Sequence, residues 1–204
     1  MRETLEKTAA ALRARGFDAA VFATAQEACA FIRGDMPAGA TVALGGSMTV
    51  MQLNLHAQLR EDGHAVLWHW ETPPEQRPAL LHEAMRAPLY MCSANALTED
   101  GLIVQIDGNG NRVSAMCYGP GTVYVIAGRN KIVRGGYTQA VQRIKQTACP
   151  QNARRQGLDT PCARQGACRP AQCPASMCHI IAAFELAPAG KRTQVVLIDE
   201  DLGY

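Results

Sequence analysis

The chain has 204 residues, of which 48% are hydrophobic and 19% are charged, and its formal net charge is +2. This composition is typical of a folded globular protein and excludes a disordered chain. The small net charge, carried by scattered basic residues, argues against nucleic acid or an anionic membrane as the partner. No apolar run approaches the roughly 18 residues of a membrane span, and the charged residues 1–7 do not resemble a signal peptide. We therefore expect a soluble, cytoplasmic protein.

Helical and strand patterns alternate over residues 1–90. Apolar spacing predicts a first helix that ends at Gly16, and the capping-box pair Thr24 and Glu27 predicts a second helix up to Gly34. Further helices are expected at about 47–60 and 74–86, and short apolar strands at 19–23, 41–44 and 65–68. Short apolar strands that alternate with helices predict an α/β fold, with a mostly parallel sheet covered on both faces.

The pattern changes after residue 88. Short β-like runs at 89–92, 102–107, 113–116 and 123–127 are separated by turn residues, and the segment 106–112 predicts a tight hairpin. A helix is expected at about 138–147 and a last strand at 194–198. Because no repeat or low-complexity linker is visible, we expect one domain over residues 1–204, with an irregular cysteine-rich insertion at 148–179.

A glycine pair stands where the strand at 41–44 is expected to pass into a helix. Gly45 and Gly46 allow a sharp turn and the close approach of a ligand. The Ser47 and Thr49 hydroxyls and the free N–H groups of the helix start suit a phosphate or a carboxylate. In an open parallel sheet, ligands lie beyond the carboxyl ends of strands, where this turn falls. The alternative is a tight turn in which Ser47 only caps the helix.

Several segments, taken in order from about residue 40 to the end, resemble the lactate-utilisation (LUD) domain family, including lactate-utilisation protein C-like members. The segments are Gly45–Thr49, Ser93–Gly101, Asp107–Val113, Gly119–Pro120, Gly128–Val133, Pro150–Ala153 and Glu200–Tyr204. The resemblance implies a three-layer α/β/α fold similar to ribose-5-phosphate isomerases and coenzyme A transferases, whose equivalent glycine turn binds phosphate or acyl-CoA groups. It also implies a link to the oxidation of L-lactate to pyruvate, and it supplies no catalytic residue.

Polar residues beside glycines, in loops between apolar strands, are candidates for ligand binding. Arg112, Arg129 or Lys131 suits a carboxylate or phosphate, and Asp100 or Asp107 suits a general base. The alternative is that the Asp and Asn side chains only satisfy the backbone of turns. The candidate ligand-binding residues are Gly45, Gly46, Ser47, Thr49, Asn95, Asp107, Asn111, Arg112, Asn130 and Lys131. The expected ligand is a small anion, either an organic acid, a phosphate or a CoA-type molecule.

Aromatic and histidine side chains flank the strand at 65–68. His64 and His69 are five positions apart and are expected on opposite faces, which argues against a metal site built from this pair. Trp68 and Trp70 share a face and are expected to pack against a helix rather than against a ligand.

Five of the eight cysteines lie in the insertion, and four of them follow one another at short intervals, namely Cys162, Cys168, Cys173 and Cys178. Four thiolates in so short a loop can supply the Cys₄ set of a zinc ion or an iron–sulfur cluster. The residues between them have little apolar content, so a bound centre would supply the order that a core cannot. The resemblance implies a comparable loop, opened here by Thr160–Cys162, although Cys173 lies later than in the family's pattern.

The nature of the centre stays open at this point. We favour a [4Fe–4S] cluster over zinc because of the resemblance to lactate-oxidation proteins, and a set of free thiols is the third reading. Cys149 is a further candidate ligand, and His179 adjoins the last cysteine of the loop.

Three functions are compatible with these features. The leading hypothesis is an accessory or electron-transfer component of L-lactate oxidation that binds an iron–sulfur cluster, with other lactate-oxidation proteins as partners. The alternative is an isomerase-like or transferase-like enzyme for a phosphorylated or CoA-linked substrate, with structural zinc. A ligand sensor without catalysis is the third. Since no nucleophile–base pair is evident, the sequence leaves open whether the protein is an enzyme.

Overall fold

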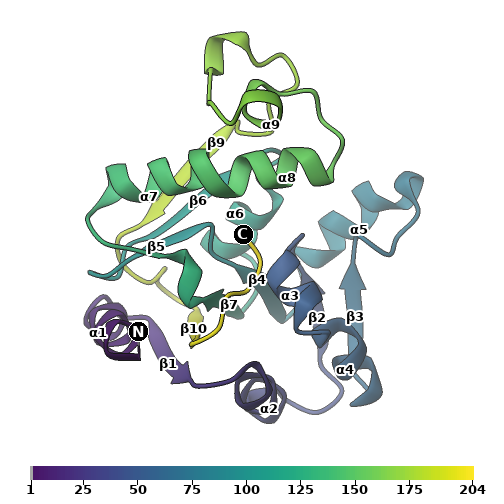
Figure 1. The fold of residues 1–204 in the computed structure, drawn as a ribbon. Helices are drawn as coiled ribbons and strands as arrows, with labels where there is room; N and C mark the ends of the chain where they lie inside the picture. The colour runs from purple at the N-terminus through teal and green to yellow at the C-terminus, as the bar shows by residue number, and fades with distance from the viewer. Residues whose placement is uncertain (1) are drawn as a thin grey trace.

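A computed structural model describes residues 2–204, so that Met1, the first residue of the predicted domain, lies outside the described residues. Its larger sheet has six strands in the order β1-β10-β7-β4-β2-β3, and every neighbouring pair is parallel (Figure 1). The strands are β1 (Asp18–Phe22), β2 (Thr41–Leu44), β3 (Ala65–Trp68), β4 (Leu89–Ser93), β7 (Thr122–Gly128) and β10 (Arg192–Ile198). The prediction of a mostly parallel sheet is confirmed.

Helices cover both faces of this sheet. Along β7, Val123 and Val125 pack with α1 (Arg2–Ala14), α5 (Arg77–Ala84) and α6 (Asn111–Cys117). The alternate residues Tyr124 and Ile126 pack with α2 (Ala25–Asp35), α3 (Met48–Gln52) and α4 (Leu55–Glu61). Because successive side chains of a strand point to opposite faces, these two cores establish the three-layer α/β/α arrangement.

A smaller, four-stranded sheet lies beside the larger one. Its order is β8-β5-β6-β9, formed by β5 (Ala96–Thr98), β6 (Ile103–Asp107), β8 (Ile132–Val133) and β9 (Ile180–Phe184). A long helical stretch packs on it through a third core, and consists of α7 (Tyr137–Arg143), a π-helical turn (Ile144–Ala148) and α8 (Cys149–Arg155) (Figure 1). The remaining helical segments among the described residues are a short helix, α9 (Pro161–Gln165), and three 3₁₀ turns (Pro74–Gln76, Arg129–Lys131 and Pro170–Gln172).

The structure corrects the predicted hairpin at 106–112. Residues 113–116 belong to α6 rather than to a strand. The Asp107 carboxylate accepts hydrogen bonds from Gly110 N (3.2 Å) and Val113 N (3.1 Å), and Gly110 has a left-handed φ of 83°. These contacts satisfy N–H groups at the start of a helix, so the turn residues lead the chain into α6 instead of back along β6.

Other boundaries also differ from the prediction. The helix expected at 47–60 is broken into α3 and α4, because Asn54 adopts a left-handed φ of 51°. The start of the predicted irregular insertion is the regular helix α8. The capping of α2 is confirmed, since Glu27 N donates to Thr24 Oγ1 over 3.2 Å. In the part of the chain that the structure describes, no helix is long and apolar enough to cross a membrane.

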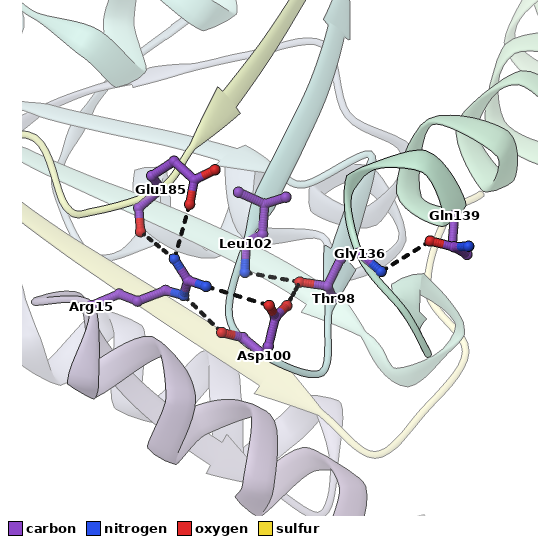
Figure 2. A network of polar contacts seen from close by, with 7 residues as sticks. All are labelled: Arg15, Thr98, Asp100, Leu102, Gly136, Gln139 and Glu185. Atoms are coloured by element: carbon purple, nitrogen blue, oxygen red, sulfur yellow. Dashed lines mark hydrogen bonds and ion pairs between the residues drawn. The ribbon is translucent and has the colours of Figure 1, made fainter.

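One arginine ties α1 to the smaller sheet. Arg15 donates from Nε to the backbone oxygen of Asp100 (2.7 Å) and from Nη1 to that of Glu185 (2.9 Å), as Figure 2 shows. The Asp100 carboxylate contacts Arg15 and the Thr98 hydroxyl, which in turn accepts from Leu102 N (2.9 Å). A single guanidinium therefore links the end of α1, the β5–β6 turn and the segment after β9.

Gly101, in the β5–β6 turn, has no room for a side chain. Its φ is +88°, and a Cβ there would lie 2.9 Å from the backbone of Ala11 and Leu12 in α1. Gly39 has a similar φ of +68° with no atom near the position of its Cβ. We expect Gly39→Ala to cost about 1–2 kcal/mol, the cost of the left-handed backbone alone. Gly101→Ala should lower the free energy of unfolding by a further amount of about 1–3 kcal/mol, because α1 must shift.

Urea denaturation of the two variants beside the parent chain measures both costs. Equal destabilisation by the two substitutions would show that the contact between Gly101 and α1 is not tight.

Candidate functional site

A cavity of about 250 Å³ opens at the carboxyl ends of the parallel strands. The loops after β2, β3, β4 and β7 meet there, together with the turn after β6, one side of α7–α8, the end of the cysteine-rich stretch and the C-terminal residue. We refer to it as the strand-end cavity. Its lining comprises Gly46, Ser47, Met48, His69, Trp70, Ser93, Ala94, Asn95, Ile106, Asp107, Gly108, Asn109, Asn111, Arg112, Lys131, Ile144, Ala148, Cys149, Asn152, Arg155, Gln156, Met177, Cys178 and Tyr204.

The structure brings most of the predicted ligand-binding residues to this cavity. Those that line it are Gly46, Ser47, Asn95, Asp107, Asn111, Arg112 and Lys131. Three others, Gly45, Thr49 and Asn130, do not line it. Thr49 and Asn130 instead hold neighbouring parts of the site. Asn130 Nδ2 donates to Gly203 O (3.1 Å) and its Oδ1 accepts from Leu202 N (3.1 Å), which fixes the C-terminal segment.

Packing explains much of the glycine turn. A Cβ on Gly45 would lie 2.8 Å from the Tyr90 hydroxyl, and one on Gly46 would lie 2.9 Å from Trp70 Nε1. The Ser47 hydroxyl accepts from Val50 N (3.2 Å) and so caps α3. These contacts are those of a tight, capped turn. Gly46 and Ser47 nevertheless form part of the cavity wall, whereas Gly45 is required by the packing against Tyr90.

Lys131 is a buried lysine at the base of the cavity. Lys131 is only 3% exposed, and its Nζ donates to Thr49 Oγ1 (2.9 Å) and Ser93 Oγ (2.8 Å). Burial lowers the pKa of Lys131 to about 7, and the positive charges of Arg143 and Arg112 act in the same direction. At neutral pH a large share of this side chain is therefore an uncharged amine.

Arg112 supplies a fixed positive charge beside it. Its Nη2 donates to Asn95 Oδ1 (3.0 Å) and to Ile106 O (2.7 Å), which holds the guanidinium in place. Its Nε is buried and has no hydrogen-bond partner among residues 2–204. The nearest carboxylate, that of Asp107, lies 4.0 Å from Nε and already accepts two backbone N–H groups. A ligand in the cavity can instead reach Arg112 Nη1, which makes no hydrogen bond among the described residues and is not one of the buried atoms.

The sequence analysis did not predict the part of the cavity wall that α8 and the C-terminal residue form. The Arg155 guanidinium lies 4.5 Å from the centre of the Trp70 ring, and its Nε donates to Tyr204 Oη (2.9 Å). Asn152 Oδ1 accepts from Arg155 Nη2 (2.9 Å) and from Tyr204 Oη (3.0 Å). Arg155 therefore reaches the cavity as a second fixed guanidinium, held by an aromatic face and two polar groups.

The prediction for the two tryptophans is half correct. Trp68 is 2% exposed and belongs to the core, as expected, but Trp70 lines the cavity beside His69. Burial lowers the pKa of His69, and its Nδ1 has no partner in the described residues 2–204. Both residues directly follow β3, so the strand-end rule that was applied to the glycine turn also identifies them.

Two other predicted residues lie outside the cavity. The proposed base Asp100 faces Arg15 on the surface, as described above. Arg129 pairs with Asp199 (3.3 Å) and Asp201 (2.9 Å), contacts that tie the end of β7 to the segment after β10. Since neither residue lines the cavity, Asp107 is the carboxylate that does so among the described residues.

The cysteines of the insertion lie on the side of the cavity formed by α8. Cys149 and Cys178 are in contact, with their sulfur atoms 3.4 Å apart, and both line the cavity. This hydrogen bond lowers the pKa of Cys178, with Lys145 acting in the same direction, and raises that of Cys149. The site thus pairs one thiolate-like sulfur with a thiol donor.

The other three predicted metal ligands are close by but do not meet. Cys162 is buried against the Thr160 hydroxyl (3.3 Å), Cys168 is exposed and Cys173 is partly exposed. Burial raises the pKa of Cys168, Lys145 opposes this rise, and the thiols of Cys178, Cys162 and Cys173 add to it. Within residues 2–204, no three potential metal-binding side chains converge on one point. The four-cysteine centre therefore stays a prediction, and His179 is not part of a described cluster.

Comparisons with known proteins agree with this fold. A family model described as "LUD domain" matches residues 5–198. A solved structure, that of a DUF162 family protein from Deinococcus radiodurans, is 13% identical, with 97% of each chain covered and a TM-score of 0.52. At this identity the likeness concerns the fold alone. No curated protein matches the chain.

The buried lysine predicts a specific pH dependence of stability. The pKa of Lys131 is about 7 in the folded chain and close to 10.5 in the unfolded one. Between these two pKa values the unfolded chain binds more protons at Lys131 than the folded chain does. The contribution of Lys131 to the free energy of unfolding therefore rises with pH in this range. We expect the free energy of unfolding of the parent chain, relative to Lys131→Met, to increase from pH 7 to pH 10 and to be constant below pH 6.

Urea denaturation of both chains at a series of pH values provides this difference, and the other titrating groups cancel between them. A difference that is flat across this range, or that falls, would show that the Lys131 amine is charged in the folded protein.

Proposed function

The chain belongs to the LUD domain family, and from this premise we propose that it binds a small organic anion in the strand-end cavity, next to a cysteine-bound iron–sulfur cluster. Its role would be that of an accessory or electron-transfer component in the oxidation of L-lactate to pyruvate, acting with other lactate-oxidation proteins. The family link supports the lactate setting, while the residues of the cavity support the choice of an anion.

The charge balance of the cavity is the observation that carries the proposal. Arg112 and Arg155 line the cavity together with Lys131, and among the described residues of the lining the one carboxylate side chain, that of Asp107, is held by backbone N–H groups. Guanidinium groups in a fixed position bind carboxylates through paired N–H donors. A carboxylate ligand would accept a hydrogen bond from the Arg112 guanidinium and would offset the positive charge of the arginines that line the cavity.

The thiols fit an iron–sulfur cluster in their chemistry. Cys162, Cys168, Cys173 and Cys178 would hold it, and the thiols of the other three all raise the pKa of Cys168. Thiolate sets of this kind bind both iron–sulfur clusters and zinc. When bound, a cluster would accept and release single electrons. Cys178 and Cys149 also line the strand-end cavity, so ligand and cysteines share one wall.

The alternative function keeps the cavity and changes the chemistry. An isomerase-like or transferase-like enzyme would use the same positive groups for a phosphate or a CoA-type ligand, and the cysteines would hold structural zinc. The Gly46–Ser47 turn in the cavity wall is the feature that supports it. Ligand preference and metal content separate the two functions.

Anion binding should depend on Arg112. Isothermal titration calorimetry with L-lactate, pyruvate and inorganic phosphate should show binding of the organic acids to the parent chain. We expect Arg112→Gln to weaken it by about tenfold or more, because a charged hydrogen bond worth about 1.5–3 kcal/mol is lost. Arg134→Gln, which removes an exposed arginine outside the cavity, is the matched control and should bind as the parent does.

Two results would contradict this part of the proposal. If phosphate alone binds, the alternative function is favoured. Equal affinities of the Arg112 and Arg134 variants would place the anion elsewhere on the protein.

Metal content tests the cluster. Protein purified without oxygen should contain about four irons and four acid-labile sulfides per chain and absorb broadly in the visible range. Serine at any one of the four predicted ligands should lower the iron content, whereas Cys117→Ser, an exposed cysteine in α6, should leave it unchanged. A content of one zinc ion per chain without sulfide would contradict the electron-transfer role and favour the alternative function. If the protein contains neither metal nor sulfide after reconstitution, the four cysteines are free thiols and the proposed cluster is wrong.

A further inference from the structure

Lys131 has the hydrogen bonds of a neutral amine. Its Nζ donates to two hydroxyl oxygens, of Thr49 and Ser93, and these are its hydrogen-bond acceptors among residues 2–204. A neutral amine has two N–H bonds and one lone pair, so both donors are used and the lone pair remains available. Thr49 is itself fixed, because its hydroxyl also contacts Leu202 O (3.2 Å).

The charges around Lys131 favour this neutral form. The charged groups that lower its pKa are Arg143 and Arg112, and the group that raises it is the buried thiol of Cys92. No carboxylate is among the groups of residues 2–204 that affect it. Arg143 cannot move away easily, since it donates to the backbone oxygens of Asn95 (2.6 Å) and Asn130 (3.0 Å). Desolvation and adjacent cations are the conditions under which a lysine becomes a nucleophile.

The cavity can present a carbonyl carbon to this amine. Lys131 and Arg112 both line it, and its volume of about 250 Å³ accommodates an acid of a few carbon atoms. Arg112 Nη1, which makes no hydrogen bond among residues 2–204 and is not one of the buried atoms, offers a donor for a carboxylate oxygen. In a 2-oxo acid the carbonyl carbon is directly bonded to the carboxylate carbon, so binding of the carboxylate by Arg112 would bring that carbon to the lysine side of the cavity.

We propose that Lys131 forms a reversible imine with a short 2-oxo acid of the pyruvate class. The Nζ lone pair adds to the C2 carbonyl carbon, and the nitrogen proton passes to the former carbonyl oxygen to give a carbinolamine. Loss of that oxygen as water forms the C=N bond, and water addition reverses the reaction. No oxidant or reductant is consumed. This inference rests on the organic-acid site of the proposed function and is independent of the cluster.

Reductive trapping tests the imine directly. The full-length protein is incubated at pH 7 with pyruvate and cyanoborohydride, digested and mapped by mass spectrometry. The expected product is a reduced pyruvate adduct on Lys131. It should form at least about tenfold faster than on the exposed Lys7, because a lysine with a pKa near 7 has far more neutral amine at this pH than one near 10.4. L-lactate, which has no carbonyl group, should give no adduct.

Two variants complete the experiment. Lys131→Arg keeps a long basic side chain but has no amine nucleophile, and it should abolish the fast adduct. Lys191→Arg, which alters another partly buried lysine outside the cavity, should leave it unchanged. Because the adduct is mapped on the parent chain, the test does not depend on whether the first variant folds.

The outcomes separate this inference from the proposed function. Calorimetric binding of pyruvate with no faster labelling of Lys131 than of Lys7 would overturn the imine and leave the anion site intact. An absence of both binding and labelling would remove the imine together with the organic-acid ligand.

Discussion

The parallel alignment of the six-stranded sheet is the constraint from which the rest of the site follows. Because every neighbouring pair of strands is parallel, the segments after β2, β3, β4 and β7 emerge at one edge. Both faces of the sheet are filled by packed helices, so the edge is the place where polar groups gather without disturbing a core. Residues of the smaller sheet, of the helical stretch up to α8 and of the C-terminal segment complete the lining of the strand-end cavity at this edge.

Around Lys131, positive charge in the cavity wall and behind it is fixed by backbone carbonyls and an amide group rather than by carboxylates. Arg112 and Arg143 are held by the oxygens of Asn95, Ile106 and Asn130, and the carboxylate of Asp107 is occupied in starting α6. These arrangements leave charge available for a ligand and keep Lys131 close to neutral. In the proposed account this site would combine carboxylate recognition with an amine nucleophile, and two cysteines of the proposed cluster region form part of its wall.

The sequence predicted the parallel core and the strand-side half of the site because both depend on local patterns. Apolar runs ending in glycine or asparagine place Gly46 and Asn95 at strand ends, where ligands bind. Arg155 and Tyr204 were missed because they reach the cavity from α8 and the chain end, and only the tertiary fold brings them together. The hairpin expected after β6 failed for another reason: the same turn residues serve a hairpin and a capped helix start, and the Asp107 carboxylate selects the helix.

The central claim is that the anion cavity and the cysteine region form one functional unit. The most direct test is electron paramagnetic resonance spectroscopy of iron-loaded protein, purified without oxygen, reduced with dithionite and titrated with pyruvate. The account predicts a signal from a reduced iron–sulfur cluster that changes as the anion saturates the cavity, because Cys178 belongs to both. A loaded protein without such a signal, or with a signal indifferent to saturating pyruvate, would contradict it.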